Sequence, residues 1–310
     1  MSKIRKAPVG IEVKHRSSLR RLYTVRVSRL IVQIAFLIIA NEGLSLILPL
    51  PVIGLSYPWT SFPSALDMLQ VMIILLIPPL LPLASIIIFN TLLGRFFCGW
   101  ICPFGFIQDI IHYAVSSKNF ISASLHSKLK YVKYVFLIII LLLFIGWASL
   151  YLNGQLSSIA NLYGRGIAYM PYTSFSPDST LFGTIPYLFS LGLLPNSIYS
   201  FFGSINAAIF IRYLILLLIL LACAKVTRFW CRYICPMGAI NALFSSRSVL
   251  GIYREVGKCD ECGICNKICP VQIDVVNANL GRLDSKECIM CFECVAACHT
   301  KAINVTFKKR

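Results

Sequence analysis

Four long apolar stretches constrain the fold of this 310-residue chain more than any other feature of its sequence. They lie at about residues 30–50, 69–93, 131–152 and 204–225, and each is close to the roughly 20 helical residues that cross the hydrocarbon core of a bilayer. Only 13% of the residues are charged, about half the share found in soluble proteins. The sequence therefore predicts an all-α transmembrane bundle of four spans and excludes the soluble globular, disordered and collagen-like classes.

The distribution of Lys and Arg orients this predicted bundle. Residues 1–29 contain nine basic residues, which the positive-inside rule places in the cytoplasm. The predicted loops 51–68 and 153–203 share a single basic residue, whereas loop 94–130 contains four and the chain after Lys225 contains twelve. We therefore expect a multi-pass cell-membrane protein with both termini cytoplasmic. We attribute the net charge of +17 to basic residues on the cytoplasmic face of the membrane, so it does not indicate a nucleic-acid partner and none is expected.

The predicted outer loop 153–203 contains one further apolar segment, Leu181–Leu194. Its fourteen residues are too few to span a bilayer, so we expect an interfacial or re-entrant piece. The loop is poor in charge and rich in Tyr, Phe, Ser and Pro. Two hypotheses remain open at this stage: the loop docks a partner or covers a site on the outer face, or it packs as a re-entrant cap.

Two segments separated by 133 residues share a cysteine motif. Arg95–Ile107 and Arg228–Ile240 are identical at eight positions, including the pattern Cys-x-x-x-Cys-Pro. Each copy follows the cytoplasmic end of a predicted span and two spans separate them, so both lie on one membrane face, as a parallel two-span repeat. Cysteines four residues apart share one face of a helix, and the Pro and Gly that follow predict a turn just below the lipid.

The repeat gathers four thiols at the membrane edge: Cys98, Cys102, Cys231 and Cys235. Four thiolates suit an iron–sulfur cluster, zinc or copper(I), and we favour the cluster because the C-terminal sequence points to iron–sulfur chemistry. Small buried thiols at helix ends and a redox-active dithiol are the alternatives. The remaining cysteine, Cys223, lies inside the last predicted span and is expected to be ordinary packing.

The C-terminal segment contains the most specific pattern, Cys-x-x-Cys-x-x-Cys-x-x-x-Cys, twice. This doubled spacing resembles that of bacterial two-cluster ferredoxins, in which the fourth cysteine of each run ligates the other cluster. The resemblance implies a small α+β domain with two 4Fe-4S clusters. One would be bound by Cys259, Cys262, Cys265 and Cys298, and the other by Cys288, Cys291, Cys294 and Cys269. His299 replaces the proline expected after the last cysteine, and we expect it to be a simple surface residue.

Taken together, the spans, the repeat and the C-terminal domain resemble the NapH/MauN group of membrane polyferredoxins, and the membrane core is similar to part of the NosR and CcoG proteins. The resemblance implies a quinol dehydrogenase subunit that exchanges electrons between the quinone pool and a partner redox protein of a larger respiratory complex. A metal-handling or maturation factor, such as a cupric reductase, and an electron-relay anchor without a quinone site are the alternatives. All four histidines lie outside the predicted spans, so no haem is expected.

The predicted organisation is a basic cytoplasmic segment over 1–29, a membrane domain over 30–250 and a ferredoxin domain over 251–310. Oxidation of a quinol requires an apolar slot, a polar group and a proton acceptor. Glu42 and Arg212 are candidates because ionisable residues within spans are costly, although a structural ion pair that holds the bundle together is the favoured explanation of the two. A second candidate lies at the cytoplasmic edge, where aromatic residues also act as interface anchors; it comprises Trp100, Asp109, Trp230 and Tyr233.

Overall fold

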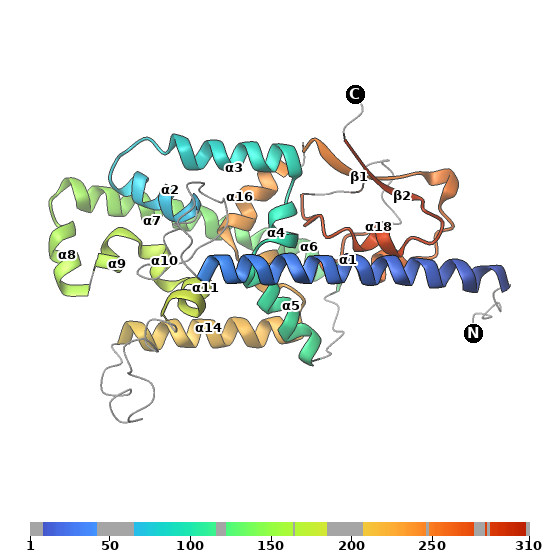
Figure 1. Ribbon diagram of the computed structural model, residues 1–310. Helices are drawn as coiled ribbons and strands as arrows, with labels where there is room; N and C mark the ends of the chain where they lie inside the picture. Colours follow the sequence, from blue (N-terminus) through green and yellow to red (C-terminus); the bar gives the residue numbers. More distant parts are fainter. Residues whose placement is uncertain are drawn as a thin grey trace.

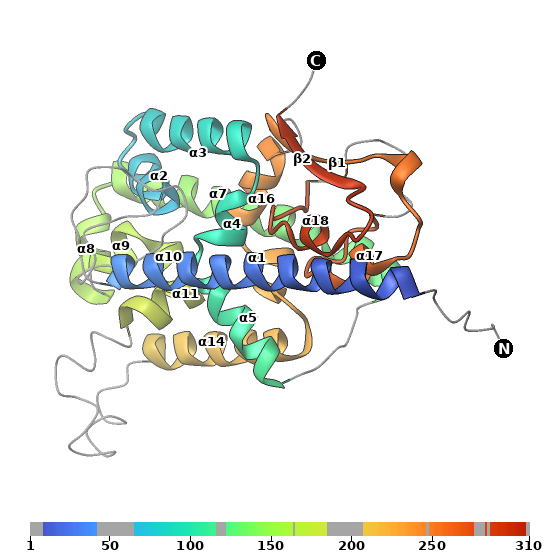
Figure 2. The ribbon, with the colours of Figure 1, turned by 45° about the vertical axis from the view of Figure 1, so that its right-hand side comes forward.

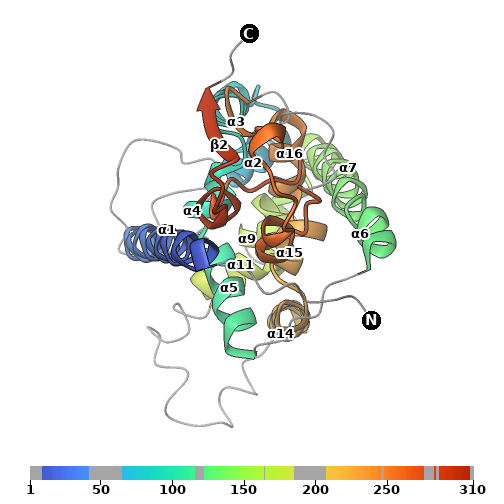
Figure 3. The ribbon, with the colours of Figure 1, turned by 90° about the vertical axis from the view of Figure 1, so that its right-hand side faces the viewer.

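The structure, a computed structural model, describes residues 9–41, 65–115, 122–163, 165–184, 207–245, 248–275, 283 and 286–307. Four long helices lie lengthwise beside one another (Figure 1), and an end-on view places them around a centre of shorter helices (Figure 3). The long helices are α1 (Val9–Asn41), α3 (Leu80–Leu93), α7 (Val132–Leu152) and α14 (Ala207–Lys225). The C-terminal domain lies at one end of this helical part (Figure 1 and Figure 2).

The shorter helices of the centre include both copies of the repeat. The first copy forms α4 and α5, the second forms α15 and α16, and α2 precedes α3. Their bounds are α2 (Ala65–Ile74), α4 (Phe96–Trp100), α5 (Pro103–Val115), α15 (Phe229–Tyr233) and α16 (Pro236–Ser245). A further short helix, α6 (Ala123–Leu129), leads into α7.

Within the described residues, one helical stretch, Ser124–Leu152, is long and apolar enough to cross a bilayer. It contains the predicted span 131–152. The expectation of one helix over 69–93 is wrong, because α2 ends at Ile74 and α3 starts only at Leu80. Pro78 and Pro79 explain this break, since proline lacks an N–H and disfavours helix at the preceding residue. The predicted span 30–50 is described only to Asn41, as the end of α1. The count of four spans therefore stays a prediction.

The described part of the predicted outer loop packs back into the helical centre, as one of the two hypotheses expected. Phe182 lies in one buried cluster with Phe104, Leu216 and Trp230. Most of Leu181–Leu194 lies outside the described residues. The elements of this loop are α8 (Leu156–Tyr163), α9 (Arg165–Tyr169), α10 (Pro171–Phe175), α11 (Pro177–Ser179) and the π-helical turn η1 (Thr180–Thr184).

The C-terminal domain has the small α+β fold that the sequence predicted. Strands β1 (Leu250–Arg254) and β2 (Ile303–Phe307) pair antiparallel, and Ile252, Met290 and Ile303 are buried against them. The domain also contains the turn η2 (Val256–Lys258) and the helices α17 (Ile264–Ile268) and α18 (Glu293–Ala297). Residues 9–29 form no separate segment, since α1 runs through them and contacts α18, α4 and α5.

Candidate metal centres

The two cysteine motifs fold alike. In each copy a short helix, α4 or α15, carries the first cysteine, and the proline after the second cysteine is the first residue of the next helix, α5 or α16. Proline favours this first helical position because the N–H that it lacks has no helical partner there. The turn predicted for each motif is therefore confirmed, and it lies just before the proline, at residues 101–102 and 234–235.

Each of the four repeat sulfurs accepts a hydrogen bond from an N–H group. The backbone N–H groups of Gly105 and Gly238 donate to the second cysteine of their own copy, to Cys102 at 3.4 Å and to Cys235 at 3.3 Å. The first cysteines are bonded by side-chain amides of the opposite copy: Gln108 Nε2 lies 3.0 Å from Cys231 Sγ, and Asn241 Nδ2 lies 3.6 Å from Cys98 Sγ. Such donors stabilise thiolate over thiol.

Gln108 and Asn241 are themselves oriented by a matched pair of residues. Asn90 Nδ2 donates to Asn241 Oδ1 at 2.9 Å, and the Cys223 thiol donates to Gln108 Oε1 at 3.4 Å. The members of both pairs are 133 residues apart, as in the repeat. Cys223 packs in a buried cluster, as expected, and its thiol in addition orients the Gln108 amide that donates to Cys231. The sequence analysis missed Gln108 and Asn241, although they directly follow the last identity of the repeat.

Two buried arginines cross between the copies. Arg228 Nη1 donates to the Cys98 carbonyl at 2.6 Å, and Arg95 Nη2 donates to the Cys231 carbonyl at 3.3 Å. A hydrogen bond from the Cys102 thiol, together with the Arg228 charge, lowers the pKa of Cys231 to about 7 although burial opposes the shift. A Cβ atom on Gly238 would lie 3.2 Å from Arg95 Nη2. The motif glycine therefore leaves room for the arginine of the other copy.

The cysteines of the C-terminal domain gather in two sets. Four of them line one pocket, with apolar residues between them: Cys269, Cys288, Cys291 and Cys294. This set combines the fourth cysteine of the first run with three of the second, the combination that the resemblance implied. In the other set, Cys265 interacts electrostatically with Cys259 and Cys262, and Cys262 with Cys298. Both donor sets suit the thiolate ligation of a 4Fe-4S cluster.

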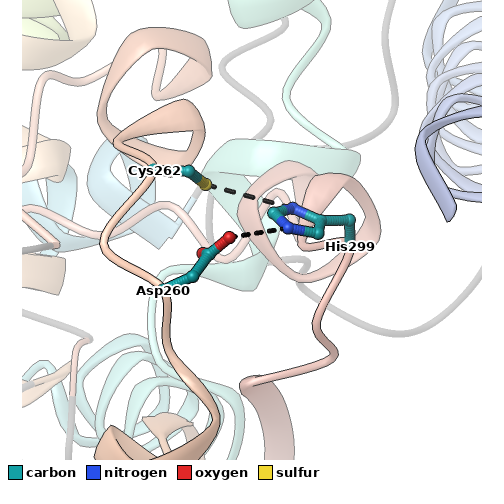
Figure 4. A group of neighbouring side chains, drawn as sticks. All are labelled: Asp260, Cys262 and His299. Carbon is teal, nitrogen blue, oxygen red and sulfur yellow. Dashed lines mark hydrogen bonds and ion pairs between the residues drawn. The ribbon is translucent and has the colours of Figure 1, made fainter. Parts of the chain in front are cut away.

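His299 is not the simple surface residue that we expected. Its side chain is only 14% exposed, and Nε2 lies 2.7 Å from Asp260 Oδ2. Nδ1 lies 4.0 Å from Cys262 Sγ, so the imidazole lies between the Asp260 carboxylate and a cysteine of the set that contains Cys259 and Cys265 (Figure 4).

The C-terminal domain docks closely on the first copy of the repeat. Cys98 is buried in one cluster with Ile289 and Cys291, against which Cys269 packs. Trp100 Nε1 donates to the Met290 carbonyl at 3.0 Å. A Cβ atom on Gly99 would lie only 2.2 Å from the Ile289 carbonyl oxygen, closer than any side chain permits. Glycine at this position therefore allows the two backbones to meet.

Buried ion pairs join α1, the repeat and the C-terminal domain. Arg29 lies 2.8 Å from Asp109 Oδ2 and 2.7 Å from Glu293 Oε1, and Arg228 binds both oxygens of Asp109 at 2.6 and 2.8 Å. Although burial opposes it, the charges of Arg228 and Arg29 lower the pKa of Asp109. A carboxylate paired in this way holds the elements together, which corrects the placement of Asp109 in a predicted quinone site.

The other predicted quinone-site residues do not come together in the described part of the chain. Trp100 stacks on Phe96, with ring centroids 5.3 Å apart, and the Tyr233 hydroxyl lies 2.8 Å from His126 Nδ1. The Arg212 guanidinium lies over the Phe175 ring at 5.6 Å. Glu42 lies outside the described residues, so its pairing with Arg212 stays a prediction.

One ionisable residue of a predicted span was missed in the sequence analysis. Lys133, near the start of α7, lies 2.5 Å from Glu287 Oε2, and Arg95 lies 3.3 Å from the same oxygen. This bridge links the helical part to the loop that carries Cys288, so Lys133 anchors the C-terminal domain.

Comparisons with known proteins agree with this arrangement. Residues 71–121 and 208–252 match the 4Fe-4S binding domain family, and residues 251–299 match the 4Fe-4S dicluster domain family. No solved structure matches the chain.

Several curated proteins are similar over most of the chain. The uncharacterized protein MJ0750 of Methanocaldococcus jannaschii is 32% identical, over 74% of this chain and 79% of its own length. The putative electron transport protein YccM of Escherichia coli is 28% identical, over 71% and 53%. The ferredoxin-type protein NapH of the same organism is 24% identical, over 68% and 62%. The relatives indicate an iron–sulfur electron transport protein, and the chain belongs to the family of NapH-type membrane polyferredoxins.

Proposed function

We propose that this chain is a membrane subunit that exchanges electrons between the quinone pool and a partner redox protein, within a larger respiratory complex. The observation that carries the proposal is the contact of Cys98 with Ile289 and Cys291. It brings the repeat thiols against one cysteine set of the C-terminal domain, as electron exchange between the two parts requires.

The proposed ligands follow the two cysteine sets of the C-terminal domain and the four cysteines of the repeat. We assign one 4Fe-4S cluster to Cys259, Cys262, Cys265 and Cys298, a second to Cys269, Cys288, Cys291 and Cys294, and a third iron–sulfur site to Cys98, Cys102, Cys231 and Cys235. Bound clusters supply one-electron transfer at potentials that hydrogen bonds to sulfur adjust. The chain contributes the N–H donors at the repeat and the apolar walls around the other sets.

The proposed location is the cell membrane, with four spans and both termini cytoplasmic. The long helices expose large apolar side chains: Leu80 on α3 is 73% exposed, Leu142 on α7 is 62% exposed and Leu218 on α14 is 57% exposed. Contiguous exposed leucine and isoleucine are unfavourable in water and suit contact with lipid. In this arrangement, α3 belongs to the second span, and α2 packs back alongside it, with Leu66 and Ile86 in one buried cluster.

Metal content and reduction by a quinol test the proposal together. Full-length protein reconstituted anaerobically should contain about twelve iron atoms and twelve labile sulfides per chain. A count of about eight of each would mean that only the C-terminal domain binds clusters and that the repeat cysteines bind none. Double substitution of Cys98 and Cys231 by serine should lower the content from twelve to eight. Duroquinol should reduce the wild type, giving a 4Fe-4S EPR signal.

The absence of such a signal after dithionite reduction would contradict the iron–sulfur assignment. Rapid reoxidation of the reduced protein by cupric ion, with no response to duroquinone, would instead favour the metal-handling function.

A further inference from the structure

A cavity lies against the repeat thiols, with no residue of the C-terminal domain in its lining. Cys102, Cys231 and Cys235 form one side of it. The other side comes from α2, which supplies Leu66 and Asp67, and from the part of the outer loop that packs into the helical centre. Helices distant in the sequence therefore enclose a space next to the proposed metal site.

The walls of this cavity are mainly apolar and aromatic. Phe104, Tyr172 and Trp230 contribute rings, and Met237 contributes a flexible side chain. Aromatic walls suit a flat ring, and a methionine adapts to an entering group with little strain. The acyl chain of a lipid would also fit such walls, but it could not form a hydrogen bond with a polar residue among them.

Asp178 is a polar residue in the lining of this cavity. Its Oδ1 atom is buried and has no hydrogen-bond partner among the described residues. Burial and the nearby charge of Asp67 raise the pKa of Asp178 to about 6. Hydrogen bonds from the Ser176 side chain and from the backbone of Asp178 and Ser179 act on this carboxylate and oppose the shift, so only its Oδ1 atom lacks a donor. The carboxylate of Asp67 accepts hydrogen bonds from Thr173 and Gln70. A buried acceptor without a donor is unfavourable, so the orphaned oxygen points to a ligand that brings a hydroxyl.

The size of the cavity limits how such a ligand enters. Its volume is about 50 Å³, room for about three or four water molecules. The hydroxyl-bearing edge of a ring fits this space, while the rest of the ring and any apolar tail must lie outside it.

We propose that the cavity binds the hydroxyl-bearing edge of a quinol, which donates a hydrogen bond to Asp178 Oδ1. The inference rests on the proposed function, and it places the quinol beside Cys102, Cys231 and Cys235. It replaces the two quinone sites predicted from the sequence; among their residues that the structure describes, Trp230 alone lines this cavity.

The experiment uses full-length protein with its clusters, embedded in lipid nanodiscs. The probe is heptyl-hydroxyquinoline N-oxide, a redox-inert ring that carries a hydroxyl, and calorimetry measures its Kd. Asp178→Asn should weaken binding about tenfold, the usual value of a hydrogen bond to a charged acceptor. Asp274→Asn is the matched control, because Asp274 is exposed and does not line the cavity; its Kd should equal that of the wild type.

Two further variants keep the test decisive if Asp178→Asn folds poorly. Tyr172→Leu removes one aromatic ring from the cavity wall and should weaken binding severalfold, whereas Tyr151→Leu, at the exposed end of α7, should not. Met237→Phe should fill the cavity and abolish binding at unchanged iron content.

The outcomes separate this inference from the proposed function. If duroquinol reduces the wild type but the cavity variants all keep the wild-type Kd, then water or lipid alone occupies the cavity and the inference is overturned. If dithionite reduces the wild type and duroquinol does not, the proposed function fails and this inference fails with it.

Discussion

Gln108 and Asn241 show how single residues prepare the repeat for thiolate chemistry. Each belongs to one copy and donates to the first cysteine of the other, so neither copy is complete alone. Asn90 and Cys223 in turn hold the two amides. Because an N–H donor stabilises negative charge on sulfur, these bonds favour the reduced state of a bound cluster.

Removing one of these donors should therefore lower the reduction potential of the repeat site. We expect Gln108→Leu to shift it by roughly −60 mV, which corresponds to about 1.4 kcal/mol for one electron. An EPR-monitored redox titration measures the shift. Gln155→Leu, at an exposed position outside the repeat, should leave the potential unchanged. If the Gln108→Leu variant kept the wild-type potential, the Gln108 amide would not act on the repeat site.

A methyl group at Gly99 should separate the C-terminal domain from the repeat. The added Cβ would lie 2.2 Å from the Ile289 carbonyl oxygen, so we expect Gly99→Ala to destabilise docking by about 1–3 kcal/mol. Limited proteolysis between α16 and α18 would report the loosened domain. Gly146→Ala is the control, since nothing lies within 4 Å of a Cβ at that position in α7. Equal cleavage of both variants would contradict the role of Gly99.

At the scale of elements, α1 links the helical part to the C-terminal domain. It contacts α4, α5 and α18, and Arg29 bridges Asp109 on α5 and Glu293 on α18. The ion pairs span three elements that are far apart in the sequence. Arg26 and Arg29, two basic residues of α1, thus dock the C-terminal domain through Glu293.

Loss of Arg29 should release part of this docking. Arg29→Gln leaves two buried carboxylates with one fewer cation, and breaking such a buried pair costs about 3–5 kcal/mol. We expect a corresponding fall in the free energy of unfolding of the C-terminal domain, measured by hydrogen exchange of its backbone amides. Arg20→Gln, at an exposed position of the same helix, should have little effect. A similar loss in both variants would indicate general weakening of α1 instead.

At the scale of the whole molecule, stability is unevenly distributed between the two parts. The C-terminal domain has a small core built around Ile252, Met290 and Ile303, whereas the helical part has separate buried clusters between several helices. A domain of this size cannot bury enough apolar surface to be stable without metal or cross-links. The proposed clusters are therefore structural as well as functional.

Removal of iron should accordingly unfold one part and spare the other. After anaerobic chelation, we expect the backbone amides of β1, α17, α18 and β2 to exchange rapidly, while those of α7 and α14 remain protected. Hydrogen exchange with mass spectrometry of the full chain measures both. Protection of the C-terminal domain without iron would contradict a structural role of the clusters.

Local sequence determined the elements whose signals are contiguous. The Cys-Pro-x-Gly motif predicted the turns at Cys102 and Cys235, and the doubled cysteine runs predicted the small α+β domain, because spacing along the chain sets such local geometry. The break between α2 and α3 was visible in Pro78 and Pro79, yet the apolar content of 69–93 outweighed it in the prediction. Hydropathy records burial or lipid contact, not the continuity of a helix.

Only the tertiary structure decided which residues serve the site. Asp109 carried the chemistry of a proton acceptor in the sequence, but the arginines folded around it make it an ion-pair anchor. No sequence pattern singled out Asp178, and it became a candidate quinol-binding residue because residues 171–179 pack beside the repeat cysteines. The physical reason is that charge pairing and cavity shape depend on side chains brought together from distant segments, and no local pattern records those contacts.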